Sequence, residues 1–213
     1  KAVGHGTQQL ARRQVGETLS LLGPIGQPFQ PNLAQRPRLL LLGGGVGIPP
    51  MLFLAQHYRA QALPIVLMGS EVPFPFVAAP SQLAMPGLPS TVTHAMPLLE
   101  SWQIPSRLAS LQGYAGCYPG YVAELARQWL ETQSPEERQR IEIFSCGPHP
   151  MLAAVAALAR QYQLPCQVSL EEFMACAVGG CAGCVFAVQT ATGTAMKRVC
   201  VDGPVFSAQQ VLF

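Results

Sequence analysis

Between residues 38 and 170 the chain alternates short β-forming runs with segments in which apolar residues recur at helical spacing. The β-forming runs are RLLLL (38–42), PIVLMGS (64–70), STVTHAM (90–96), IEIFSC (141–146) and CQVSL (166–170). The helical segments are PPMLFLAQHYRAQ (49–61), GYVAELARQWLETQ (120–133) and PMLAAVAALARQYQ (150–163). Strands that alternate with helices form a parallel sheet with helices on both faces. The sequence therefore predicts an α/β fold with a doubly wound parallel sheet.

Composition excludes several classes of protein. The 213 residues include 13 Lys and Arg against 11 Asp and Glu, so the chain lacks a basic field for nucleic acid. The longest uncharged stretch, residues 39–56, approaches the length of a membrane span, but three consecutive glycines and a Pro-Pro pair divide it. Seven cysteines, four of them clustered, suit metal binding in a reducing compartment better than a disulfide framework. We therefore expect a cytoplasmic protein that binds neither nucleic acid nor a membrane.

The two ends of the chain differ from this middle part. Residues 1–36 contain turn signals and short apolar runs, such as residues 18–22, that suit strands of a small β domain. About 35 residues are too few to bury a core, so we expect the tail of a domain whose earlier part is absent. After Leu170, VFAVQ (185–189), a TATGT turn and AMKRVC (195–200) predict a β-hairpin.

Four cysteines near the C-terminal end suggest a metal site. Cys176, Cys181 and Cys184 have the spacing C-x4-C-x2-C, and fifteen residues separate Cys184 from Cys200, which the predicted hairpin returns toward them. Thiolates bind soft metals, and this spacing is typical of plant-type [2Fe–2S] sites. Structural zinc more often uses two separated C-x2-C pairs, of which this chain has one, so iron and sulfide are favoured. A cysteine-bound zinc module that binds a partner without redox turnover is the alternative from another class.

Small residues surround these cysteines. They are Ala175, Ala177, Gly179, Gly180, Ala182 and Gly183. Without larger side chains, backbone N–H groups can approach the sulfides of a cluster and tune its reduction potential.

A glycine-rich turn follows the first predicted strand. Its glycines are Gly43, Gly44, Gly45 and Gly47, directly before a helix that opens with Pro49 and Pro50. Glycines at such a turn let a pyrophosphate approach the backbone, and the helix N-terminus offers N–H groups and a positive dipole end. The motif departs from G-x-G-x-x-G, so on this motif alone a tight turn without a ligand is an equal alternative.

A second strand-to-helix turn has the sequence FSCGPHPM, residues 144–151, and contains Cys146, Gly147 and Pro148. Ligands of doubly wound sheets lie at the carboxyl ends of the strands. The two turns can therefore bracket one dinucleotide, with Cys146 at the mouth of the site.

Both turns carry a resemblance to a known family. GGGVGIPPM (43–51) and CGPHPM (146–151) resemble the nicotinamide-binding motifs of the ferredoxin–NADP reductase superfamily. Within it, SLEEFMACAVGGCAGCVF (169–186) and KRVCVDGPVF (197–206) resemble the electron-transfer subunits of class 1B dihydroorotate dehydrogenases. VGHGT (3–7) with the LLGPIGQPF that follows resembles the end of that family's FAD-binding barrel, so the chain is similar to an N-terminally truncated member.

The resemblance implies three domains and three cofactors. The domains are the remnant of an FAD-binding β-barrel in 1–36, a ferredoxin reductase-like NAD domain in 37–168 and a small [2Fe–2S] β-hairpin domain in 169–213. The cofactors are the [2Fe–2S] cluster, FAD and NAD.

The resemblance also assigns roles to residues. Gly6 and Thr7 match the contact with the flavin phosphate, and Gly43, Gly44, Gly45 and Gly47 match the NAD turn. Cys146, Gly147 and Pro148 match the segment near nicotinamide and flavin, which makes Cys146 the one catalytic candidate. Cys176, Cys181, Cys184 and Cys200 match the cluster ligands one for one.

The implied function is electron transfer in pyrimidine biosynthesis. Electrons would pass from the FMN of a catalytic subunit that oxidises dihydroorotate, through the cluster and FAD, to NAD+. Flavin accepts electrons singly and delivers a pair, whereas a cluster carries one at a time and nicotinamide accepts only hydride. The implied partner is that FMN subunit, in a heterotetramer with two chains of each kind. The alternative within this class is a related iron–sulfur flavin reductase that serves a hydrogenase, a sulfite reductase or a ferredoxin:NAD(P) system.

Overall fold

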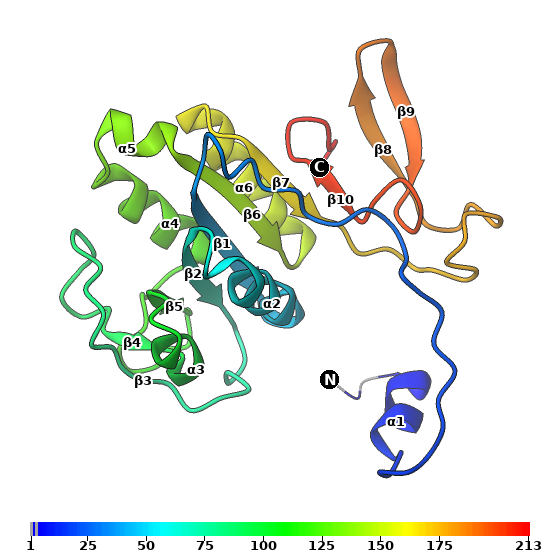
Figure 1. Cartoon of the computed structure of the whole chain (residues 1–213), viewed down its shortest axis with the longest axis horizontal. Helices are drawn as coiled ribbons and strands as arrows, with labels where there is room; N and C mark the ends of the chain where they lie inside the picture. Colours follow the sequence, from blue (N-terminus) through cyan, green and yellow to red (C-terminus); the bar gives the residue numbers. More distant parts are fainter. Residues whose placement is uncertain (1, 3) are drawn as a thin grey trace.

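A six-stranded sheet forms the centre of the computed structural model, which describes residue 2 and residues 4–213. The strand order is β10-β7-β6-β1-β2-β5 (Figure 1). The parallel strands are β1 (Arg38–Gly44), β2 (Leu63–Gly69), β5 (Ser106–Ala109), β6 (Ile141–Cys146) and β7 (Cys166–Ser169), and β10 (Val205–Ser207) is antiparallel to β7. The predicted α/β class and parallel sheet are confirmed.

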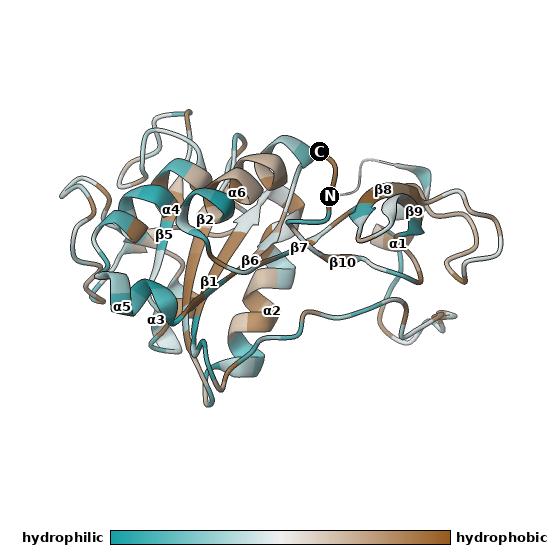
Figure 2. Ribbon diagram, turned by 90° about the horizontal axis from the view of Figure 1, so that it is seen from above, coloured by the Kyte–Doolittle hydropathy of each residue, from teal (hydrophilic) through white to brown (hydrophobic). Residues whose placement is uncertain are grey.

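Helices cover both faces of the sheet because its strands are apolar on both faces. Leu39 and Leu41 of β1 belong to the core cluster under α2 (Ile48–Tyr58). Leu40 and Leu42 belong to the other cluster, with α4 (Val122–Glu131) and α6 (His149–Tyr162). Figure 2 shows the strands of the sheet centre coloured mainly as hydrophobic. Burial on both faces is typical of parallel sheets.

The edge strand β5 was not predicted from the sequence, and the expected strand at 90–96 is wrong for most of its length. Only β4 (His94–Ala95) forms there, paired with β3 (Ala79–Pro80). The sequence of β5 lacks an apolar run because it contains the buried polar residues Ser106 and Arg107, so its pattern does not predict a strand. The Arg107 guanidinium is satisfied by backbone carbonyls, including those of Val92 at 3.1 Å and Leu83 at 2.8 Å.

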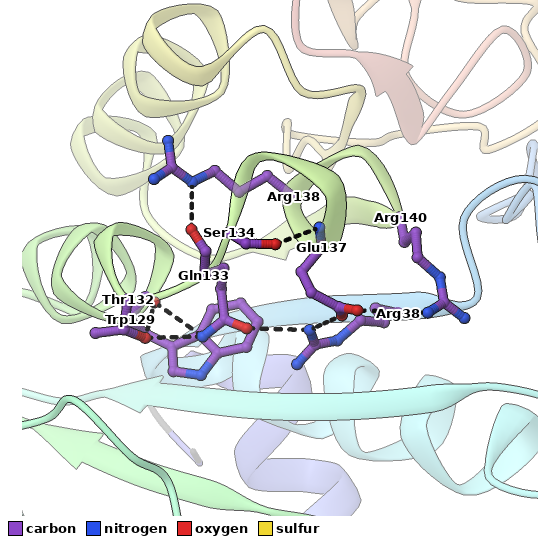
Figure 3. Close-up of polar contacts among 8 residues, drawn as sticks. All are labelled: Arg38, Trp129, Thr132, Gln133, Ser134, Glu137, Arg138 and Arg140. Carbon is purple, nitrogen blue, oxygen red and sulfur yellow. Dashed lines mark hydrogen bonds and ion pairs between the residues drawn. The ribbon is translucent and has the colours of Figure 1, made fainter.

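A polar network closes the sheet at the amino ends of its strands. Arg38 begins β1, donates to Glu137 and Gln133, and places its guanidinium 5.3 Å from the ring centroid of Trp129 (Figure 3). Glu137 lies in the short α5 (Pro135–Gln139), which Ser134 caps. The carboxyl ends of the strands lie at the opposite edge.

Residues before β1 form α1 (His5–Ala11) and then an extended path to the sheet. None of the residues of α1 is buried, and Figure 1 shows it well away from the sheet. The expected strand at 18–22 is wrong, because this segment has no strand assigned within the described chain. A strand needs a neighbour for its N–H and C=O groups, and residues 18–22 lie exposed without one. The barrel remnant itself stays a prediction.

The C-terminal part forms the predicted hairpin from β8 (Val185–Thr190) and β9 (Gly193–Arg198). It is joined to the sheet by β10, which the sequence analysis did not predict. Val188, Val199 and Val211 pack into the same core cluster as α6. The remaining elements are η1 (Gly45–Gly47) and α3 (Pro97–Ser101). Within the described residues, none of the helices has the length and apolar character needed to cross a bilayer.

Candidate site at the carboxyl ends of the strands

The two glycine-containing turns lie side by side. Strands β1 and β6 are neighbours, and Gly43 is opposite Cys146 in their register. The buried Ser145 hydroxyl donates to the Leu42 carbonyl at 3.1 Å and ties the two strand ends together. Because the strand order reverses direction between β1 and β6, this is the switch point at which doubly wound sheets bind ligands.

Close packing explains most of the glycines in these turns. A Cβ atom on Gly47 would collide with the carbonyl oxygen of Cys146, and one on Gly44 would collide with the Met151 sulfur. A Cβ on Gly147 would lie 2.8 Å from the same sulfur. The two turns are therefore shaped by each other, whether or not a ligand is bound. Met151, which fills the space between them, was not singled out from the sequence.

Gly45 differs from the other glycines. Its φ of +55° lies in the left-handed region, and a Cβ built on it meets nothing within 4 Å. It is exposed, so it is the glycine of this turn whose missing side chain leaves room for a ligand.

The start of α2 offers fewer N–H donors than the sequence analysis expected. Pro49 and Pro50 have no N–H, and the Ile48 N–H is already bonded to the Gly45 carbonyl. A dinucleotide phosphate at this turn would therefore depend on the close approach of the glycine backbone more than on the helix N-terminus.

Cys146 lies at the end of β6, half-buried and between the glycine turn and the cysteine loop. Burial raises the pKa of its thiol, and the negative charge of Glu171 adds to this, while a hydrogen bond with Ser169 acts in the opposite direction. The thiol is thus neutral at physiological pH. Ser169 is opposite Cys146 in the β6–β7 register and was not singled out from the sequence.

The four predicted cluster cysteines form two pairs. In the first, the Cys181 N–H lies 3.4 Å from the Cys176 sulfur and the two thiols are within hydrogen-bonding reach. In the second, the Cys200 N–H lies 3.4 Å from the Cys184 sulfur and the thiols again interact. Cys184 and Cys200 are buried, whereas Cys181 is exposed.

The loop backbone directs N–H groups at sulfur. Hydrogen bonds from the Cys181 N–H, the Val178 N–H and the Cys181 thiol, largest first, lower the pKa of the Cys176 thiol to about 6, and the Gly180 N–H adds a smaller contribution. Ala177 and Ala182, each following a cysteine, adopt φ of +58° and +52°. Non-glycine residues in the left-handed region occur at strained, functional turns. The loop thus directs amides at its own cysteine sulfurs, and their approach to the sulfides of a cluster stays a prediction.

The donor set suits a binuclear cluster better than one metal ion. Among the residues that the structure describes, no three Cys, His, Asp or Glu side chains converge on a single ion position. A mononuclear zinc site needs four ligands around one point, whereas a [2Fe–2S] cluster needs four thiolates to share between its two irons. Two thiol pairs, with three of the four cysteines in a loop of many small residues and Cys200 just after the hairpin, fit the second requirement.

His149 connects the second turn, residues 144–151, with the cysteine-containing part. It is the first residue of α6, and its Nε2 lies 3.6 Å from Glu172 Oε1. Its ring centroid lies 5.4 Å from that of Phe186 on β8 and 6.4 Å from that of Phe213. The second turn and the hairpin domain therefore meet at this side chain.

Gly6 and Thr7 are not brought to these turns. Both lie on α1, where the Thr7 hydroxyl donates to the Gly4 carbonyl at 3.0 Å, and Figure 1 shows this helix apart from the sheet. The described residues therefore do not assemble an FAD site around Gly6 and Thr7, and that assignment stays a prediction.

Three cavities of similar size lie away from the glycine turns. One of about 480 Å³ includes Glu142 in its lining, one of about 490 Å³ includes Arg59 and Trp102, and one of about 450 Å³ includes Trp129. The buried Glu142 carboxylate already accepts from the Asn32 N–H and the Gln167 amide, both at 2.9 Å. Because its acceptors are occupied within the chain, we assign no ligand there.

Comparison with known proteins identifies the family. Residues 171–212 match the "Iron-sulfur cluster binding domain of dihydroorotate dehydrogenase B". The dihydroorotate dehydrogenase B (NAD(+)) electron transfer subunit of Caldanaerobacter subterraneus is 35% identical over 214 residues, covering 99% of this chain and 72% of that protein. The subunit of the same name from Shouchella clausii is 33% identical, covering 100% of this chain and 72% of that protein.

A solved structure shares the fold. The NADH-dependent reduced ferredoxin–NADP oxidoreductase, described for flavin-based electron bifurcation, aligns with a TM-score of 0.71 at 24% identity. The alignment covers 100% of this chain and 67% of that one. The predicted family is confirmed by the sequence relatives: the chain belongs to the electron transfer subunits of dihydroorotate dehydrogenase B (NAD(+)), an oxidoreductase.

Proposed function

We propose that this chain transfers electrons to NAD+ in pyrimidine biosynthesis. The electrons come from a catalytic subunit that oxidises dihydroorotate. Cys176, Cys181, Cys184 and Cys200 would hold a [2Fe–2S] cluster. NAD would bind at the glycine turns, and FAD would lie between the two sites. The observation that carries the proposal is the gathering of four thiols, as two pairs, in a segment that directly follows β7.

The positions of the two turns support this order of groups. Cys146 ends β6 next to Gly43 on one side and next to Ser169 on the other. The cysteine loop begins only a few residues after Ser169, so the nicotinamide turns and the cluster site are neighbours. A neutral Cys146 thiol can contact flavin or nicotinamide without adding charge, and we propose that role for it.

When bound, the cluster would supply one-electron transfer, and the flavin and nicotinamide would exchange hydride. The chain's own residues bind and orient these groups. Loop N–H groups stabilise thiolate at Cys176, and Gly45 leaves the NAD turn open on its exposed side.

An apolar surface beside the cysteine loop supports a protein partner there. Phe173 is 94% exposed, Met174 50% and Val178 64%. Exposed apolar side chains gathered in one segment are typical of interaction sites, and electron transfer requires the cluster to lie close to its donor. We propose that the catalytic subunit binds this surface, in a cytoplasmic heterotetramer.

We also propose the domain limits 1–36, 37–168 and 169–213. The family match over residues 171–212 and the hairpin that starts at Val185 support a separate cysteine-containing domain. The parallel strands β1, β2, β5, β6 and β7 support the NAD domain.

The first test concerns the cofactors. The chain is purified anaerobically together with a dihydroorotate-oxidising subunit, and its visible spectrum and electron paramagnetic resonance (EPR) signal are recorded after reduction by NADH. We expect the signal of a reduced [2Fe–2S] cluster. Colourless protein with one zinc per chain would contradict the proposal and favour the zinc module.

The second test concerns the reaction. The same complex is supplied with dihydroorotate and NAD+, and NADH formation is followed by absorbance. We expect turnover that requires both subunits. Full cofactor loading without association or turnover would instead favour a reductase subunit that serves another partner.

A further inference from the structure

The turn that carries Cys200 is closed by two charged residues. One carboxylate oxygen of Asp202 accepts the Arg198 backbone N–H at 2.8 Å and the Arg198 Nε at 3.3 Å. In return, the Asp202 N–H donates to the Arg198 carbonyl at 2.8 Å. Cys200, in the middle of this turn, therefore has a backbone that is held at both ends.

Arg198 also reaches across to the first cysteine pair. Its Nη1 donates to the Gly179 carbonyl at 3.1 Å, and Gly179 lies between Cys176 and Cys181. A Cβ on Gly179 would lie 2.7 Å from a Val201 methyl and 3.2 Å from Arg198 Nη1, so the two segments are in close contact here. One guanidinium thus joins the segment of one thiol pair to the segment of the other.

Folding stability does not explain this arrangement. The Arg198 and Asp202 side chains are 41% and 25% exposed, and ion pairs with this much solvent contact add little to stability. The planar guanidinium can donate in two directions at fixed geometry, which a lysine ammonium on a flexible stem does not reproduce. The Arg198 contacts are therefore suited to fixing the distance between the Cys200 turn and the Gly179 segment.

We propose that Arg198 is a positioning residue that sets the separation of the two cysteine pairs, with Asp202 orienting its guanidinium. The inference rests on the proposed function, because it assumes that the four cysteines share one binuclear cluster. Groups that orient metal ligands commonly change metal affinity about ten- to hundredfold when they are removed.

The competing explanation is that the positive charge of Arg198, and not its geometry, stabilises the cluster. A neighbouring lysine provides a control for this charge effect. Lys197 is the adjacent cation, with its Nζ 3.9 Å from the other carboxylate oxygen of Asp202. Lys197→Gln removes the same unit of charge as Arg198→Gln but leaves the Arg198 bonds to Asp202 and Gly179 in place. Arg198→Lys keeps the charge and loses the two-directional geometry.

The experiment compares wild type with Arg198→Lys, Arg198→Gln and Lys197→Gln in the loaded complex. It measures the rate of cluster loss in excess chelator, the line width of the reduced EPR signal, and the urea midpoint as a control for folding. We expect both Arg198 variants to lose the cluster about tenfold faster and to give broader signals. We expect Lys197→Gln to lose it at the wild-type rate, and all urea midpoints to agree.

Two results would overturn the inference alone. One is that Arg198→Lys loses the cluster at the same rate as the wild type and gives the same EPR signal. The other is the same acceleration in Lys197→Gln as in Arg198→Gln, which would assign the effect to charge. A wild-type chain that holds no cluster would instead overturn the proposed function, so the two failures are distinguishable.

Discussion

The glycine turns and the cysteine loop follow the same edge of the sheet, yet they are stabilised in different ways. Gly43, Gly44 and Gly47 are buried, and the two turns pack directly against each other and Met151. The first cysteine pair lies in a loop with exposed residues on both sides. Amide contacts to sulfur at 3.4 Å and the Arg198 bond to the Gly179 carbonyl hold this loop. The shape of the turns is a property of the folded sheet, whereas the shape of the loop depends more on what the thiols bind.

The second cysteine pair is intermediate between the tightly packed glycine turns and the exposed cysteine loop. Cys184 and Cys200 are buried in the core cluster shared with α6, and the Val199 N–H donates to the Cys184 carbonyl at 2.9 Å. The fold therefore buries the second cysteine pair, whereas the first pair stays closer to the surface. Metal binding of this kind contributes to folding free energy locally.

The largest expected effect is the loss of the cluster in Cys200→Ser. A hydroxyl is a poor ligand for iron compared with thiolate, so we expect most of the reduced EPR signal to disappear. Far-ultraviolet circular dichroism is expected to show that the sheet remains folded, because Cys200 lies outside its strands. Cys117→Ser, the same change outside the loop, is the matched control and is expected to keep the signal. An unchanged signal in Cys200→Ser would exclude this residue as a ligand.

A smaller effect separates the two kinds of glycine in the turn at residues 43–47. Gly47→Ala places a Cβ against the Cys146 carbonyl, so we expect its free energy of unfolding to fall by about 3 kcal/mol. In Gly45→Ala the new Cβ has no close neighbour, and the cost is mainly that of a left-handed φ in alanine. We expect its free energy of unfolding to fall by about 1 kcal/mol. Urea unfolding measures both changes.

NADH affinity gives a second measurement on the Gly45→Ala variant. If Gly45 leaves room for the dinucleotide, Gly45→Ala weakens NADH binding although the fold is nearly intact. Titration of NADH by calorimetry checks this. Unchanged affinity in Gly45→Ala would place the dinucleotide elsewhere.

A further effect is confined to alkaline pH and concerns the buried Cys166 thiol in the sheet. Burial raises the pKa of the Cys166 thiol well above its usual 9.0, and the charge of Glu142 adds to this. Above about pH 9 the unfolded chain releases this proton while the native chain keeps it, so stability falls as pH rises, by about 1.4 kcal/mol per pH unit. Below about pH 9 both states keep the proton and the thiol makes no difference.

Cys166→Ala tests this sign. We expect the variant to be less stable near neutral pH, because it leaves a small cavity, but to lose less stability between about pH 9 and pH 10.5. Urea unfolding at several pH values measures the slope. Equal slopes in wild type and variant would show that another group titrates.

Local patterns determined much of this protein. Four adjacent leucines predicted β1, because a run that is apolar on both faces must be buried on both. The Cys spacing predicted an iron–sulfur site, because C-x4-C-x2-C is typical of plant-type [2Fe–2S] ligands. The strand ends at Gly43 and Cys146 predicted that the two turns meet at the carboxyl ends of the strands, because parallel strands share one direction.

Only the tertiary structure decided which groups meet. The pairing of β10 with β7, the carbonyl partners of buried Arg107, and the reach of Arg198 to Gly179 join residues that are far apart in the sequence. Each depends on how separate elements dock, and no local periodicity records that. The strand expected at 18–22 did not form for the same reason, because a strand exists only where a neighbouring chain segment accepts its hydrogen bonds.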